Sequence, residues 1–300
     1  MFSIGQRTRH TAAMPPAPAW AGVGACTLPE TDLAVRQPVP RRLTYHLMVL
    51  ATAGQGTVEV DFHTRDCRPG TVVWIRPGQA LRFGGQPGLE ANLVAWEHDL
   101  LTGEQLPGLT VEDAGPTASR DLTGADSEAI GSGFTRLADD CGRLDPGPVA
   151  ASLIRHELVV LLLRMALIAR PDGGSPPSAE GRTFARFRRA LEEGHAASRR
   201  VEDYAAQLDC SVRTLTRASL AITGRTAKQV VDDRVALEAR RLLACTDDSV
   251  AEVGRVLGFP EPTNFGRFFH REVGQSPGAF RMLIRESWDN HVPQQRVVDA

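Results

Sequence analysis

The spacing of hydrophobic positions changes along the chain near residue 126. Before that point, short apolar runs alternate with glycine and proline turns, a pattern typical of β-strands. The runs that predict strands are Leu43–Ala51, Gly56–Phe62, Val72–Ile75 and Ala91–Trp96. Several short strands at near-regular spacing predict a small β-sandwich or barrel.

After residue 126 the apolar residues recur at helical spacing. Ile130, Phe134 and Leu137 begin this pattern, and the run from Leu153 to Leu167 continues it. A breaker-rich segment over residues 171–177 then precedes a second helical region that extends to about residue 286. The sequence therefore predicts an α+β chain of two domains, with strands only in the first.

The second helical region contains an internal repeat. Its two copies each begin with a helix that is apolar at positions i, i+3, i+4 and i+7, and these positions are Val201, Tyr204, Ala205 and Leu208, then Val250, Val253, Gly254 and Leu257. A short turn and a second amphipathic helix follow, and the predicted buried stripes are Leu215, Ala218, Ser219 and Ile222, then Phe265, Phe268, Phe269 and Val273. Two short helices joined by a tight turn form a helix-turn-helix, so the repeat predicts two such units.

Capping residues fall at the boundaries of these predicted helices. Ser211 is placed as an N-cap, Ser249 and Glu252 have capping-box spacing, and Ser276 with Pro277 predicts the start of a further helix. Residues 227–244 form one apolar-periodic helix between the two units, with a length of about 27 Å at ~1.5 Å per residue. Major-groove faces on one side of DNA lie about 34 Å apart, so a helix of this length suits two neighbouring grooves.

The outward faces of the two second helices have side chains suited to reading DNA. Arginine pairs with guanine, asparagine with adenine, and threonine contacts a thymine methyl or a phosphate. The candidate DNA-binding residues are Arg213, Thr214, Thr216 and Arg217 in the first unit and Thr263, Asn264, Arg267, His270 and Arg271 in the second. A basic helix can simply be a solvated face, but two basic faces in register favour double-stranded DNA as the partner.

Charge is distributed in agreement with that prediction. Residues 182–286 contain 18 Arg and Lys against 14 Asp and Glu, whereas residues 1–181 contain 15 against 20. A basic module beside an acidic one indicates an anionic partner for the carboxyl-terminal part alone.

These motifs resemble the AraC-type transcription regulators. The resemblance extends over about 100 residues, through 201–208, 211–217, Gly224, Arg234, 238–243, 249–253, 257–259, 264–269, 274–277 and 280–281. It implies two helix-turn-helix units bridged by a long helix, with DNA contacts from Arg213, Thr216, Arg217, Thr263 and Arg267. The chain departs from the family at Ser219, Ala227 and Leu220–Ala221, where an aromatic, a proline and a basic pair are common. We therefore expect a loosely packed first unit and a second unit that holds phosphate more strongly.

The front half resembles the cupin-like sensing domain of the same family. Val60–Phe62 followed by Arg68–Gln79 carries the resemblance, and the helices that end in 153–168 resemble the family's dimerisation helices. The resemblance implies a cupin-like β-barrel, a homodimer and a small-molecule effector, with RNA polymerase as a further candidate partner. His46, Trp74, Phe83 and Trp96 are the candidate effector-pocket residues. A regulator whose front domain only dimerises remains an alternative.

A metal-dependent cupin enzyme is the alternative from another functional class. Such an enzyme needs two or three histidines and a carboxylate that converge in the barrel. His46 and His63 lie on predicted strands, but Ala80 occupies a position where cupins often have a metal histidine, and no His-x-His pair occurs. We therefore expect no enzyme activity, metal or cofactor, and we expect the Cys67 thiol to be inert.

The predicted organisation follows from these observations. We expect a flexible arm over residues 1–20, an effector-binding and dimerisation domain over 21–170, a linker over 171–181, a double helix-turn-helix domain over 182–286 and a tail over 287–300. Charged residues interrupt the longest apolar run, and the five cysteines are scattered. A cytoplasmic location, nucleoid-associated when DNA is bound, and no membrane partner are the corresponding expectations.

Overall fold

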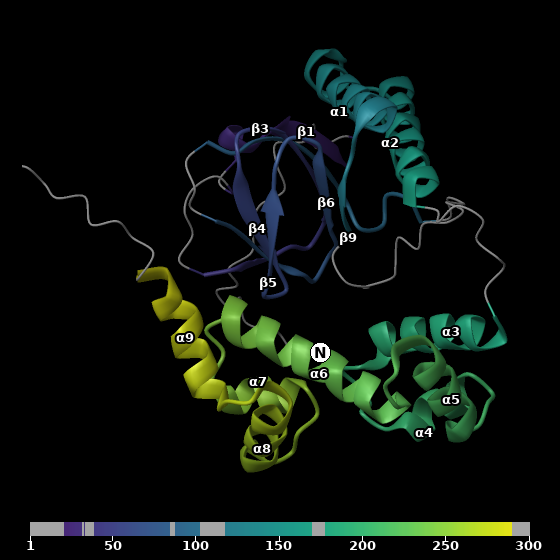
Figure 1. Cartoon of the computed structure of the whole chain (residues 1–300), viewed down its shortest axis with the longest axis vertical. Helices are drawn as coiled ribbons and strands as arrows, with labels where there is room; N and C mark the ends of the chain where they lie inside the picture. The colour runs from purple at the N-terminus through teal and green to yellow at the C-terminus, as the bar shows by residue number, and fades with distance from the viewer. Residues whose placement is uncertain are drawn as a thin grey trace, which may run out of the picture. The chain divides into compact units, whose positions relative to one another are not determined.

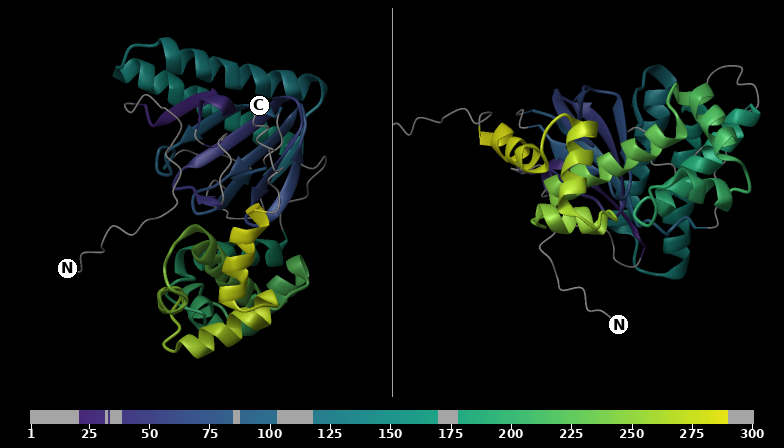
Figure 2. Two further views of the ribbon diagram at one scale, coloured as in Figure 1. Left: turned by 90° about the vertical axis from the view of Figure 1, so that its left-hand side faces the viewer. Right: turned by 90° about the horizontal axis from the view of Figure 1, so that it is seen from below.

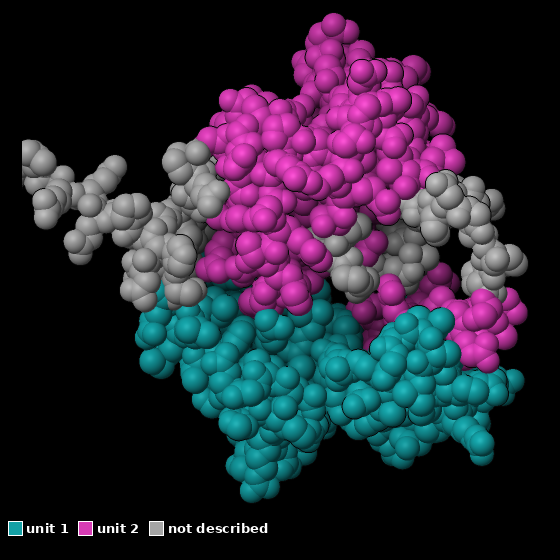
Figure 3. Space-filling view, in the orientation of Figure 1, with its two compact units in different colours: residues 1–10, 37–40, 193–300 teal, residues 11–36, 41–192 magenta. Residues whose placement is uncertain are grey.

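The computed structural model describes residues 21–31, 33, 39–84, 88–102, 118–169 and 178–289. The chain divides into two units, one with residues 11–36 and 41–192, the other mainly with residues 193–300 (Figure 3). The expected arm over 1–20, most of the linker over 171–181 and most of the tail over 287–300 lie outside the described residues.

The strands of the first unit form two antiparallel sheets. One sheet has the order β1-β8-β3-β6-β9 and the other the order β2-β7-β4-β5. Their bounds are β1 Val23–Thr27, β2 Arg41–Arg42, β3 His46–Ala53, β4 Gly56–Val60, β5 His63–Cys67, β6 Thr71–Ile75, β7 Ala80–Phe83, β8 Glu90–Trp96 and β9 Ala118–Asp121. A short 3-10 helix, Leu28–Glu30, follows β1. The described strands thus form two sheets with separate hydrogen-bond ladders, and no ladder closes them into one barrel.

Strand β3 separates two hydrophobic cores. Because side chains alternate along a strand, Leu47 and Val49 point into the core shared by the two sheets, and Met48 and Leu50 point to the opposite face. That opposite face is covered by helices α1 (Gly124–Arg143) and α2 (Pro148–Ala169), which lie over one face of the strands in Figure 2. No helix in the described part of the chain is long and apolar enough to cross a membrane.

The second unit is helical. Its elements are α4 Val201–Gln207, α5 Val212–Thr223, α6 Ala227–Cys245, α7 Val250–Val256, α8 Pro262–Val273 and α9 Pro277–Asp289, and α3 (Ala179–Gly194) precedes them in the chain. Figure 1 shows α6 between α4 and α5 at one end and α7 and α8 at the other. Both α5 and α8 pack directly on α6. The bounds of α6 agree with the predicted connecting helix to within one residue.

Candidate nucleic-acid interface

Helix α5 is fixed at both ends by its own sequence. Ser211 is the N-cap and accepts a hydrogen bond from the Thr214 amide at 3.1 Å. Gly224 ends the helix with a φ of 70°, which glycine adopts without steric cost. Leu215, Ala218 and Ser219 are buried, as predicted, whereas Ile222 is 49% exposed and does not belong to the buried stripe.

The burial of that stripe turns the predicted polar face of α5 outward. Arg213 and Arg217 are exposed, and Thr214 and Thr216 are half-buried. The Thr214 hydroxyl also lies 2.9 Å from the Ser211 hydroxyl, so it takes part in the cap. The two arginines therefore extend further into solvent than the threonines between them.

Helix α8 repeats this arrangement with larger buried side chains. Pro262 begins the helix, Gly274 ends it with a φ of 83°, and Phe265, Phe268 and Phe269 are buried. The predicted contact residues are all exposed, namely Thr263, Asn264, Arg267, His270 and Arg271. The structure thus brings the candidate residues of each unit together on the solvent face of one helix.

Helices α5 and α8 are each preceded by a turn, and the two turns have the same backbone conformation. Asp209 between α4 and α5 has a φ of 50°, and Gly258 between α7 and α8 has a φ of 74°. These left-handed residues occupy corresponding positions of the repeat. Asparagine, aspartate and glycine are the residues that tolerate this region best, so both turns have suitable chemistry.

The exposed arginines differ in the number of ion pairs and hydrogen bonds that they form within the protein. Within the described residues, Arg213 and Arg267 form no ion pair or hydrogen bond. Arg271 instead donates to Glu272 at 2.7 Å, lies 3.7 Å from Asp232 of α6, and has its guanidinium 5.4 Å from the ring centre of Phe268. Part of its charge is neutralised within the protein.

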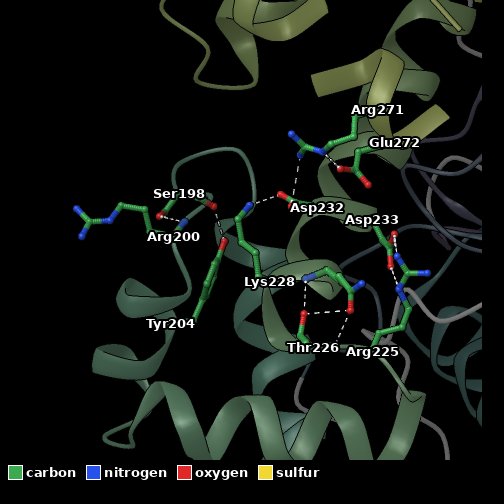
Figure 4. Close-up of polar contacts among 11 residues, drawn as sticks. Ser198, Arg200, Tyr204, Arg225, Thr226, Lys228, Asp232, Asp233, Arg271 and Glu272 are labelled. Carbon is green, nitrogen blue, oxygen red and sulfur yellow. Dashed lines mark hydrogen bonds and ion pairs between the residues drawn. The ribbon is translucent and has the colours of Figure 1, made fainter. Parts of the chain in front are cut away.

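Ion pairs of α6 join it to α8 and to the segment that precedes it (Figure 4). Asp232 pairs with Lys228 one turn earlier and with Arg271 of α8. Asp233 pairs with Arg225 at 2.8 Å, just before the helix. Burial raises the pKa of Asp233, and the Arg225 guanidinium opposes that rise. The spacing of Lys228 and Asp232 was a visible signal of their pairing, but no local pattern indicated the contact with α8.

The candidate effector residues of the strand-rich unit occupy two different cores. His46, Trp74 and Trp96 lie together on the helix-covered face, whereas Phe83 belongs to the core between the sheets. The His46 ring stacks on Trp96 at 4.9 Å, and Trp74 Nε1 donates to His46 Nδ1 at 3.3 Å. The structure thus brings three of the four candidate side chains together and places Phe83 in the other core.

His46 is held as a neutral imidazole. Burial, followed by the charges of His98 and Arg76, lowers its pKa to about 3. Because a tryptophan N–H can only donate, Nδ1 is the acceptor and Nε2 carries the proton. Nδ1 is thus occupied by this hydrogen bond, and no group of three His, Cys, Asp or Glu side chains among the described residues is placed to hold a metal ion.

Cys67 lies at the end of β5 and is buried. Burial raises the pKa of its thiol to about 11, and the carboxylate of Asp66 acts in the same direction. A thiol with a raised pKa has little thiolate at neutral pH and is a poor nucleophile. This environment agrees with the expectation of an inert cysteine.

Comparisons with known proteins agree with this geometry. Residues 204–282 match the family model described as a helix-turn-helix domain. The transcriptional activator NphR of a Rhodococcus species is 26% identical over 238 residues, which cover 79% of this chain and 69% of the relative. The MmsAB operon regulatory protein of Pseudomonas aeruginosa is 27% identical over 249 residues, which cover 80% and 76%.

A similar solved structure is the DNA-binding domain of AdpA, described as a global transcriptional factor in complex with a target DNA. It is 34% identical and covers 38% of this chain and 96% of that chain, with a TM-score of 0.32.

Proposed function

Because the chain is an AraC-type DNA-binding transcriptional regulator, we propose that α5 and α8 enter two neighbouring major grooves of one duplex. The observation that supports this proposal is the pairing of two exposed basic helix faces with one connecting helix. Helix α6 has 19 residues and a length of about 28 Å at ~1.5 Å per residue. The offset of each recognition helix from the ends of α6 supplies the rest of the ~34 Å groove spacing.

In this proposal the two units contact DNA in different ways. Arg213 and Arg217 of α5, with Thr214 and Thr216, approach one groove. In the second unit the contacts come from Thr263, Asn264, Arg267, His270 and Arg271. Arg267 has no intramolecular partner among the described residues, so it is the strongest candidate for pairing with a guanine. Arg271 is held by Asp232 and Glu272, which suits a phosphate contact of fixed position.

Selection of bound duplexes from a random pool tests this proposal directly. The expected result is a sequence with two conserved blocks whose centres lie about one helical turn apart. A single conserved block would show that only one unit reads bases. Absence of any enriched sequence, with binding that depends only on salt, would contradict sequence-specific reading.

The strand-rich unit, which precedes the helix-turn-helix region, is proposed to be a cupin-like sensing domain that forms a homodimer. Helix α2 is mainly apolar, although Arg155, His156, Glu157 and Arg164 interrupt it, and apolar helix faces are normally covered. It nevertheless exposes Val149, Leu153, Val160 and Leu167, and the last three repeat every seven residues, as in paired helices. Val160→Glu is expected to give a monomer in sedimentation, and Thr135→Glu on the exposed face of α1 serves as a control.

A small-molecule effector of the strand-rich unit is part of the same proposal. The matching front halves of relatives that regulate transcription support this role over a metal-dependent enzyme. A ligand that binds only the folded state must raise the unfolding temperature, so a thermal-shift screen with metabolites detects an effector. No shift with any compound would favour a front unit that only dimerises. Stoichiometric iron or manganese in the purified protein would favour the enzyme.

The domain limits and location are proposed together. Residues 182–286 bind DNA, residues 21–170 bind the effector and dimerise, and residues 171–181 link them. A dimer that contacts two DNA sites tolerates only the spacings this linker can reach. The protein acts in the cytoplasm on the nucleoid, and RNA polymerase is its further partner if it activates transcription.

A further inference from the structure

A short segment before α4 is held firmly against the first helix-turn-helix unit. This segment, residues 194–200, is named the strap. The Tyr204 hydroxyl donates to the Ser198 carbonyl at 2.7 Å, and the Tyr204 ring packs so closely on Gly194 that an added Cβ would lie 3.1 Å from it. Figure 4 shows Tyr204 pointing toward Ser198. The strap therefore keeps a fixed position relative to α4.

Arg199 extends from the strap to the second helix-turn-helix unit. Its Nη2 donates to the Gly258 carbonyl at 2.9 Å, and its guanidinium carbon lies 3.6 Å from the ring centre of Phe259. Both residues belong to the turn between α7 and α8. Burial lowers the pKa of Arg199, which agrees with a partly desolvated site where cation–π attraction is stronger than in water.

The contact with Phe259 reaches the second recognition helix. The Phe259 ring lies 5.4 Å from the Phe265 ring and 5.0 Å from the Phe268 ring, centre to centre, and both of these belong to α8. A connected series of contacts thus joins the strap to α8 without passing through α6. The two helix-turn-helix units are joined by helix α6 and, independently, by the contacts of Arg199.

A second connection changes what the unit can do mechanically. Helices α5 and α8 each pack on α6, and the Arg271–Asp232 ion pair also joins α8 to α6, so α6 sets their separation. Those attachments all lie along α6. A contact away from the α6 axis adds resistance to rotation of one helix-turn-helix unit relative to the other. Two recognition helices must keep both their separation and their mutual angle in order to enter neighbouring grooves.

We propose that Arg199 is a positioning residue that sets the angle between α5 and α8 and thereby the spacing of DNA contacts that the protein accepts. This inference rests on the proposed function, in which both helices read one duplex. Arg199 itself is not expected to touch DNA, because its guanidinium is engaged by the Gly258–Phe259 turn.

The test compares binding of the full chain to the selected duplex and to the same duplex with one base pair inserted between its two conserved blocks. The insertion rotates one block by roughly 35° relative to the other. The natural chain is expected to bind the inserted duplex at least tenfold more weakly. Arg199→Ala is expected to bind the selected duplex roughly tenfold more weakly, within the usual range for coupling between contacting residues, and to lose most of the insertion penalty.

Two further variants sharpen this test. Arg200→Ala is the matched control, because Arg200 is the next residue and, among the described residues, its side chain pairs only with the exposed Glu202. It should retain the full insertion penalty. Arg199→Lys should be intermediate, since lysine provides a donor but no planar group to stack on Phe259. If Arg199→Ala does not fold, the lysine variant supplies the measurement.

A loss of affinity with an unchanged insertion penalty would overturn the proposal, because general destabilisation weakens binding to both duplexes alike.

A second measurement needs no DNA. Distances between spin labels on α5 and α8 should broaden in Arg199→Ala and not in Arg200→Ala. An unchanged distance distribution overturns the positioning role. A broadened one without any selected sequence supports it while contradicting the proposed groove reading.

Discussion

The two helix-turn-helix units have one backbone geometry and different interiors. Each turn is closed by the same hydrogen bond, from the Cys210 amide to the Ala205 carbonyl at 3.0 Å and from the Phe259 amide to the Gly254 carbonyl at 2.9 Å. Each recognition helix has 12 residues and ends at a left-handed glycine. Turn and cap chemistry therefore determine the shape of both units, whatever fills them.

The difference between the units lies in the volume of the buried side chains. Phe265, Phe268 and Phe269 occupy the places that Leu215, Ala218 and Ser219 occupy in the first unit. Phe269 also contacts the ring of Phe280 of α9 at 5.6 Å between ring centres. Larger buried apolar area gives more stabilisation, at about 25 cal/mol per Å², so we expect the second unit to be the more stable of the two.

The largest expected effect comes from Phe269→Ala. Removing a fully buried phenyl ring leaves a cavity and typically lowers the free energy of unfolding by about 3–5 kcal/mol. Hydrogen exchange measures each unit separately, and protection should fall in α7 and α8. Val256→Ala, at a half-exposed position of the same unit, should change protection by far less. An equal loss in α4 and α5 would show that the two units unfold together.

This contrast also explains how much of the fold could be predicted from the sequence. The helices of the helix-turn-helix region were predictable because they have periodic apolar stripes and because several begin at local caps, as at Ser211 and Ser249. Strands β1, β2, β5, β7 and β9 were missed. Strand β5 has four exposed residues, and β2, β7 and β9 are at most four residues long, so they give little apolar pattern. The division of the strands into two sheets depends on pairing between distant segments, which periodicity does not reveal.

The candidate site shows the same limit. The exposed positions of α5 and α8 followed from the periodicity of the buried stripe. Arg199 gave no signal, because its partner Gly258 is 59 residues away. The separation of Phe83 from Trp74 and Trp96 was also hidden, since strand alternation assigns faces only once the register of each strand is known.

Gly254→Ala tests the close approach of helices that only the second unit requires. An added Cβ would lie 3.0 Å from the Cβ of Phe265, which is fully buried and cannot move aside. We expect a loss of about 1–3 kcal/mol in the free energy of unfolding, from overpacking. The first unit already has Ala205 at the corresponding position, where it packs near smaller side chains.

Gly266→Ala is the matched control for this substitution. Gly266 lies in α8, and an added Cβ there would meet no atom within 4 Å. Alanine is the better helix former, so this variant should be more stable by about 0.5–1 kcal/mol. If both variants lose stability, helix crowding is not the reason for the glycine at 254.

Arg267→Ala and Arg217→Ala compare proposed DNA contacts at corresponding positions of the repeat. Arg267 has no partner within the described chain, whereas Arg217 has an intramolecular interaction. We expect Arg267→Ala to weaken binding to the selected duplex by about 1–3 kcal/mol and to relax preference at one base pair. Arg217→Ala should have the smaller effect. An equal loss on all sequences would assign Arg267 to phosphate.

Ser219→Ala has the smallest expected effect and the opposite sign. The Ser219 hydroxyl is fully buried, and it has no hydrogen-bond partner among the described residues. A buried polar group without a partner costs free energy that its removal recovers, so alanine should stabilise the first unit by about 1 kcal/mol. Stronger hydrogen-exchange protection in α4 and α5, with α7 and α8 unchanged, is the expected observation. Weaker protection would mean that the Ser219 hydroxyl is hydrogen-bonded in solution. The first helix-turn-helix unit would then be closer in stability to the second than its small buried side chains suggest.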